Sequence, residues 1–180
     1  MTVSAATRTL QCMAVLTAFL ASGCASWMSQ FDAKQAALER ERYGATADYR
    51  IKEFHTSAEL AKKGTSAEQM EFTRSLTAAV LAEHDPRVRA AIVDVAAGFD
   101  APAAVAICKG ALEDPDPRVR VAACAAWRER GGPEAVALLS ARYEADTEID
   151  VRLKALRELG QLGDEEAIPA LARALEDPDP

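Results

Sequence analysis

The chain has 180 residues, a formal net charge of −7 and an isoelectric point near 5.0, which is enough length for one domain and a leader. Proteins that bind nucleic acid without sequence specificity have a basic surface, so this negative charge argues against nucleic-acid binding as the function. Apolar residues make up 49% of the chain but aromatic residues only 6%. This composition favours close packing of small side chains and leaves little bulk to line a deep pocket.

The first 23 residues have the layout of a targeting segment. Arg8 supplies a positive start, and Leu10–Leu20 is an apolar run that is too short to span a bilayer. The segment ends Leu20-Ala21-Ser22-Gly23-Cys24. This ending resembles the bacterial lipoprotein box, in which the cysteine is lipidated and becomes the mature N-terminus. The resemblance implies palmitate and other acyl chains at Cys24; ordinary secretory cleavage with an incidental cysteine is the alternative.

The residues after the cysteine bear on location. Ala25 and Ser26 follow Cys24 and no aspartate does, which by the same resemblance implies the outer membrane of a two-membrane cell, on the periplasmic face. Removal of residues 1–23 takes away Arg8 and no acid, so the mature charge is −8. Two or more acyl chains give firm membrane attachment.

Residues 24–64 are interpreted as a tether followed by an irregular capping helix. Ala33–Tyr43 is charged and favours helix, and Thr46–Lys63 has the apolar spacing of a second helix. Terminal units of repeat proteins are often atypical because one side meets solvent. A repeat domain is then expected over residues 65–180, and a start of the solenoid at Thr46 is the alternative. Its first helix is expected to start at Ser66, which with Gln69 has the spacing of a capping box.

The rest of the chain repeats itself. Ala111–Pro117 recurs without change as Ala174–Pro180, and Asp85, Asp116 and Glu148 mark corresponding turns at steps of 31 and 32 residues. A fixed period of this size is the signature of a solenoid, in which each unit is one supersecondary element stacked on the next.

Each period is expected to hold two helices. Asp116 can cap the first helix, and Pro117 suits its first position because no amide hydrogen is needed there. Gly131-Gly132-Pro133 ends this helix and starts the second, and Asp164 is expected to cap the last helix of the chain. Apolar residues recur at three- and four-residue steps and no strand-like alternation occurs. The sequence therefore predicts an all-α fold, an α–α superhelix of antiparallel helix pairs.

The Asp-Pro-Arg-Val-Arg starts at Asp85 and Asp116 resemble those of HEAT repeats, in particular the short type named after phycobilisome lyases. The resemblance covers roughly Ser66 to Pro180. In that family an aspartate and an arginine near this turn form a structural ladder between neighbouring units. It implies that the ladder here consists of Asp85, Arg89, Asp116, Arg120 and Arg152. Local pairing of residues four apart and an anion site of stacked arginines are the alternatives.

The chain ends at Asp179-Pro180, which has the form of a helix cap and first residue. Because a solenoid normally finishes with a polar capping helix, we expect a further repeat beyond this point. A frayed tail is the alternative.

No catalytic, metal or cofactor site is predicted. The two histidines, His55 and His84, have no metal-ligand spacing, and phosphate-loop, Gly-x-Ser-x-Gly and Cys-x-x-Cys motifs are absent. Cys108 and Cys124 fall on apolar helix faces and are expected to pack as small core residues. A disulfide between them is the alternative in an exported chain. Trp127 is expected to be a packing residue.

These features predict a non-catalytic protein–protein interaction scaffold in the cell envelope, held to the membrane through lipidated Cys24, with another protein as its partner. Candidate contact residues on the second helices are Lys109, Arg142 and Arg173. The alternative is an enzyme or enzyme accessory of the bilin-lyase-like class. The leader argues against it, since phycobilisome assembly is cytosolic. A structural subunit of a larger envelope assembly is a third reading.

Overall fold

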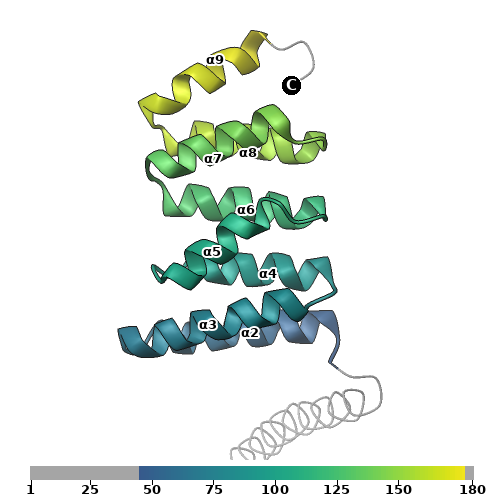
Figure 1. Ribbon diagram of the computed structural model, residues 1–180, viewed down its shortest axis with the longest axis vertical. Coiled ribbons are helices and arrows are strands. Elements are labelled where there is room, and N and C mark those ends of the chain that lie inside the picture. Colours follow the sequence, from purple (N-terminus) through teal and green to yellow (C-terminus); the bar gives the residue numbers. More distant parts are fainter. Residues whose placement is uncertain (1–44, 177–180) are drawn as a thin grey trace, which may run out of the picture. The chain divides into compact units, whose positions relative to one another are not determined.

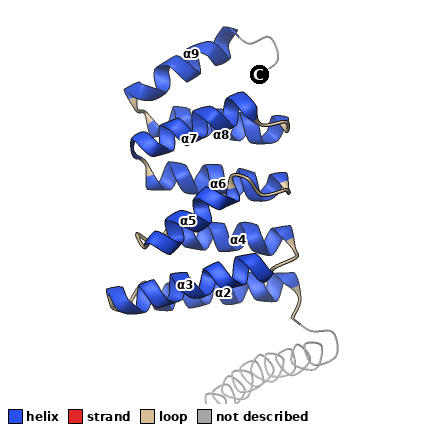
Figure 2. Ribbon diagram, in the orientation of Figure 1, coloured by secondary structure: helices blue, strands red, loops and turns tan. Residues whose placement is uncertain are grey.

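The computed structural model describes residues 45–176. The leader, Cys24, the predicted helix over residues 33–43 and the terminal Asp177–Pro180 lie outside the described residues. In chain order the elements are α2 (Ala47–Ala61), α3 (Ser66–Ala82), α4 (Pro86–Ala97), α5 (Pro102–Ala111), α6 (Pro117–Arg130), α7 (Gly132–Ala145), α8 (Ile149–Leu162), the 3-10 turn η1 (Glu165–Ala167) and α9 (Ile168–Glu176). Every element in this described part is helical, and it contains no strand (Figure 2).

The helices form two layers (Figure 1). The first helices of the pairs, α2, α4, α6 and α8, pack on one another in chain order, and the second helices lie over them on one side. Helix α2 packs against α4 as α4 packs against α6, so the stack of pairs includes α2, in agreement with the alternative start at Thr46. The predicted all-α solenoid of helix pairs is confirmed.

The core follows the period found in the sequence. Val88, Val119 and Val151 stand at corresponding positions of α4, α6 and α8, and all three are fully buried. Corresponding alanines of the second-helix layer, Ala104, Ala135 and Ala167, are fully buried as well. A helix whose buried stripe is mainly valine and alanine can approach its neighbour closely, because little side-chain volume separates the backbones. The small-residue composition therefore produces the close stacking of the first-helix layer.

The first helices of the inner units begin as the sequence predicts. The Asp85 and Asp116 carboxylates each accept a hydrogen bond from the backbone N–H two residues on, at 2.9 Å, and a proline follows at the first helical position. The carboxylate thus satisfies a donor that has no partner within the helix.

Removal of one cap should weaken the fold measurably. The substitution Asp116→Ala should lower the free energy of unfolding by about 1 kcal/mol, because the Arg118 N–H then loses its acceptor. Urea denaturation followed by circular dichroism measures this loss. Asp116→Asn is the control, since asparagine caps equally well, and equal losses in both variants would contradict the capping role.

The capping box of α3 lies one residue earlier than predicted. Thr65, not Ser66, is the N-cap: its Oγ1 accepts from the Glu68 N–H at 3.4 Å, and the Glu68 carboxylate accepts from the Thr65 N–H at 2.6 Å. Thr65 has extended backbone whereas Ser66 is already helical. The Gln69 side chain instead donates to the carbonyl oxygens of Lys62 and Gly64. The one-residue error arises because both Thr65 and Ser66 have acceptable partners three residues on.

The last predicted cap also differs in detail. Asp164 caps the single turn η1 rather than α9, since its Oδ1 accepts from the Glu166 N–H at 3.0 Å. Helix α9 then follows without a break from Ile168.

Candidate functional site

Arginines of the first helices tie neighbouring units together. The Arg89 guanidinium, on the first turn of α4, donates from Nε and Nη2 to the two carboxylate oxygens of Asp114, both at 2.8 Å. Its Nη1 donates to the carbonyl oxygens of Glu83 and His84 in the turn before its own helix. One side chain therefore joins two successive turns of the solenoid.

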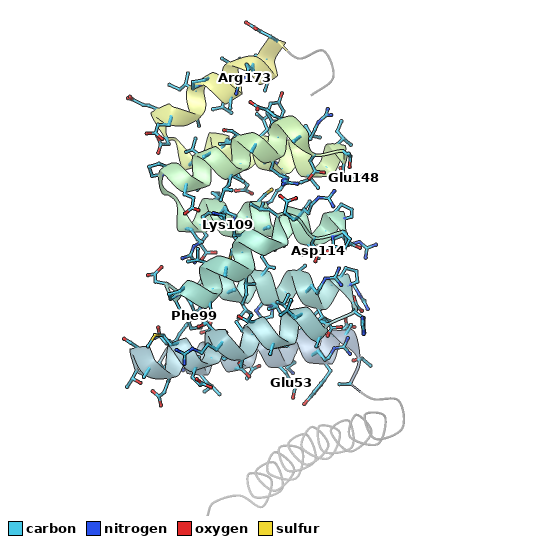
Figure 3. All side chains as sticks on the ribbon, viewed as in Figure 1. Glu53, Phe99, Lys109, Asp114, Glu148 and Arg173 are labelled. Carbon is cyan, nitrogen blue, oxygen red and sulfur yellow. The ribbon has the colours of Figure 1, made fainter. Side chains whose placement is uncertain are left out.

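The next unit repeats this arrangement. Arg120 of α6 donates to both carboxylate oxygens of Asp146, at 2.9 and 2.8 Å, and its Nη1 donates to the Asp114 carbonyl oxygen at 2.9 Å. Asp146 also accepts from the Glu148 N–H at 3.0 Å and from Arg142 Nη1 at 3.3 Å. Figure 3 places Asp114 and Glu148 on the same side of the helix stack, where these turns follow one another.

In the first unit the arginine pairs with a glutamate instead of an aspartate. Arg50 of α2 donates to the Glu83 carboxylate at 2.9 and 3.1 Å, and Glu83 accepts from the Asp85 N–H at 2.8 Å. The inter-repeat ladder is defined as these three pairs: Arg50–Glu83, Arg89–Asp114 and Arg120–Asp146.

The predicted acids of the ladder were wrong. Asp85 and Asp116 cap their own helices, and Asp85 also pairs with Arg87 at 2.9 Å, where this contact and the cap lower its pKa to about 2. An N-cap carboxylate points at the free N–H groups of its own first turn, while the arginine one turn later points at the following unit. The anion-site alternative loses its support as well, because Arg89 and Arg120 are each neutralised by a bidentate carboxylate.

A signal for the true acids was present in the sequence. An acid stands two residues before each cap, as Glu83 before Asp85, Asp114 before Asp116 and Asp146 before Glu148. In this acid-x-acid turn, the first acid pairs with the ladder arginine, and the second acid is the N-cap residue of the following helix. The Asp-Pro-Arg-Val-Arg motif begins at the cap residue, so it does not contain this acid.

Arg152 occupies the ladder position of α8. It lines a pocket of about 420 Å³ together with Tyr143, Glu144 and Arg173. Asp177, which corresponds to Asp114 in the repeated segment, lies outside the described residues.

Burial and pairing act in opposite directions on the ladder acids. Burial raises the pKa of the Asp146 carboxyl, but hydrogen bonds from Arg120, Glu148 and Arg142 outweigh it, and the pKa lies below its ordinary value. Asp114 behaves in the same way with Arg89 and the Asp116 N–H. Both carboxylates are therefore held in the charged form by the fold.

The three predicted contact residues of the second helices all have partners on a neighbouring unit. Lys109 lies 3.0 Å from the Glu134 carboxylate, Arg142 pairs with Glu113, and Arg173 pairs with Glu144. Figure 3 shows Lys109 and Arg173 on separate units of the stack. These cations contribute to contacts between units. The second-helix layer is therefore a weaker candidate for the surface that binds a partner protein through charge.

Cys108 and Cys124 are free and buried, and Trp127 lies between α6 and α5, where its Nε1 donates to the Cys108 carbonyl oxygen at 3.2 Å. Burial raises the pKa of Cys108 to about 11 and that of Cys124 to about 12.

These thiols should be inert in the folded protein. At pH 8 a thiol reagent such as dithiobis-nitrobenzoate should leave Cys108 and Cys124 unmodified, because both are buried and protonated. In denaturant both should react at once, and the released chromophore counts two thiols in a chain that carries Cys12→Ala and Cys24→Ala. Rapid reaction of either thiol without denaturant would contradict the packed positions.

Within residues 45–176, no three or more His, Cys, Asp or Glu side chains are grouped so as to hold a metal ion. The described helices are also too short or too polar for any of them to cross a membrane.

Comparison with known proteins agrees with the repeat geometry. The family model for HEAT repeats matches residues 73–152 and 141–180, which together are more than half of the chain. No curated protein matches the chain significantly. Repeats of this kind commonly mediate protein–protein interaction. On the stacked helix pairs, the ladder and this match, the chain belongs to the HEAT repeat family.

Proposed function

We propose that this chain is a lipid-anchored, non-catalytic scaffold of the cell envelope, which binds another protein through its HEAT repeats. The observation that carries the scaffold role is the stack itself, because helix pairs in a row present extended exposed faces rather than one enclosed site. The coarser part of this role, a helical repeat scaffold for protein interaction, follows from the family.

The anchor is supported by the sequence alone. The apolar run Leu10–Leu20 and the ending Ser22-Gly23-Cys24 match the layout of a lipoprotein leader. With Ala25 and Ser26 after the cysteine, the proposed location is the outer membrane, on the periplasmic face. The short subtype named after phycobilisome lyases remains part of the proposal as well.

Metabolic labelling with radioactive palmitate tests the anchor. Label should enter the wild-type chain and should be lost in Cys24→Ala. Cys12→Ala is the matched control, because Cys12 leaves with the leader and its removal should not change labelling. Label that persists in Cys24→Ala would refute lipidation at this position.

The scaffold role is tested by chemical cross-linking in intact cells followed by purification of the full chain. A discrete protein partner, recovered with the wild-type chain and depleted for unanchored Cys24→Ala, is the expected result. Copurified tetrapyrrole or metal in place of a protein would favour the enzyme or enzyme-accessory alternative.

A further inference from the structure

A groove of about 560 Å³ lies on the first-helix layer between α6 and α8, and its described lining residues all belong to these two helices. We call it the first-helix groove, and its lining residues are Pro117, Arg118, Val121, Asp150, Leu153, Lys154 and Arg157. Val121 is half-buried and Leu153 is 44% exposed, so the middle of the groove is apolar and open to solvent.

Two arginines of the groove have no close ion pair with a carboxylate in the described part of the chain. Arg118 comes no closer than 4.0 Å to the Asp116 carboxylate, which is occupied with capping α6. Arg157 makes no ion pair with any residue in the described part of the chain. Lys154, in contrast, lies 2.5 Å from the buried Glu158 carboxylate, which it shares with Arg128. The groove therefore has an apolar middle and one guanidinium group from each helix with at most a long contact to a carboxylate, and Asp150 is the one acid among its described lining residues.

The preceding unit shows that stacking does not require these residues. In the contact between α4 and α6, Ala90 of α4 takes the place of Val121, Val121 of α6 that of Leu153, and Ala125 of α6 that of Arg157. Arg87, which corresponds to Arg118, is paired with Asp85 at 2.9 Å. Helix α4 therefore packs against α6 without a leucine or an arginine at these two positions. The leucine and the arginine of the α6–α8 groove are therefore not required for first helices to pack on one another.

We propose that the first-helix groove binds an acidic peptide segment of the partner protein. Carboxylates of the segment pair with Arg118 and Arg157, and an apolar side chain between them packs on Val121 and Leu153. On a chain of net charge −7, a local basic groove attracts an acidic segment to one place. The inference rests on the proposed scaffold function and names its contact surface and partner chemistry.

A labelled peptide tests the groove directly. The probe is a fluorescent peptide in which two leucines are flanked on each side by Glu-Asp, and its control replaces every acid by lysine. Fluorescence anisotropy with the purified full chain should show binding of the acidic peptide only. Binding should weaken as sodium chloride is raised, because exposed charges are screened.

Variants locate the binding site. The double variant Arg118→Glu, Arg157→Glu should weaken peptide binding at least about tenfold, as loss of two charge-assisted contacts would. Leu153→Ser provides a second, independent reduction through the apolar contact. Arg74→Glu on α3 is the matched control for charge, since Arg74 is exposed and lies outside the groove; this variant should bind as the wild type does. Circular dichroism checks that all variants keep their helical content.

Other outcomes overturn the inference. No binding of the acidic peptide, or equal binding by the double variant, removes the groove as the site. Arginine-dependent binding of Cys24→Ala to phosphatidylglycerol vesicles instead of peptide would assign the groove to lipid, and groove-dependent self-association would assign it to a second copy. If the cross-linked envelope partner persists in the double variant, the groove fails while the scaffold function stands.

Discussion

The substitution Asp146→Ala should lower the free energy of unfolding by about 3 kcal/mol, because it leaves largely buried arginines without their carboxylate. Asp146 is 1% exposed at its side chain and accepts four hydrogen bonds, two of them from Arg120. Its removal leaves the largely buried guanidinium groups of Arg120 and Arg142 without their shared carboxylate. A buried charge that loses its partner is costly, whereas removal of both partners is often nearly neutral.

Chemical denaturation measures this loss, and Glu134→Ala is the control. Glu134 also pairs across units, with Lys109, but both side chains are more than half exposed. Such pairs contribute less than about 1 kcal/mol. Equal destabilisation by the two substitutions would show that burial does not set the strength of the ladder.

Low pH should weaken the Arg120–Asp146 pair and so lower the free energy of unfolding. The pKa of Asp146 is lower in the folded protein than in the unfolded chain, where an aspartate has a pKa of about 3.9. The pair's contribution is therefore complete above the unfolded pKa and is lost as pH falls through the folded pKa. Asp146→Asn removes this charge, so the loss of stability between neutral and acid pH should be smaller in this variant. An unchanged pH profile would contradict the pairing.

The substitutions Leu112→Ala and Leu175→Ala should differ strongly in cost although the two leucines lie in identical seven-residue segments. Leu112 is 2% exposed and Leu175 is 91% exposed. Leu112→Ala should lower the free energy of unfolding by about 2–4 kcal/mol, through lost burial and the cavity left behind. Leu175→Ala should change it by less than about 0.5 kcal/mol.

The same denaturation experiment, run on both single variants, makes each the control for the other. Similar losses of stability would show that both leucines are buried, and that the local seven-residue segment alone decides the burial of this leucine. Leu81 stands one period before Leu112 and is 82% exposed. It borders an apolar groove of about 260 Å³, which α5 lines with Ile107 and the small residues Ala106, Gly110 and Ala111. The neighbours at each unit, rather than the leucine itself, decide the burial.

Local signals in the sequence were sufficient for the architecture. The period of 31 to 32 residues, the Asp-Pro starts and the apolar steps predicted the helix pairs, and the caps at Asp85 and Asp116 formed as expected. These features depend on hydrogen bonds within one turn and on one helix face, which neighbouring residues determine. Errors of one residue, as at Thr65, arose where adjacent residues offered equal capping chemistry.

The sequence by itself determined that helices pair, repeat and bury valine and alanine on one face, because those choices depend on residues three or four positions apart. Only the tertiary structure decided which acid each arginine meets and which of two identical leucines is covered. Arg89 and Asp114 are far apart in sequence, and their contact exists only after one unit has stacked on the next. The arginine of one unit and the turn of the following unit meet at a distance that packing of the valine and alanine stripes sets.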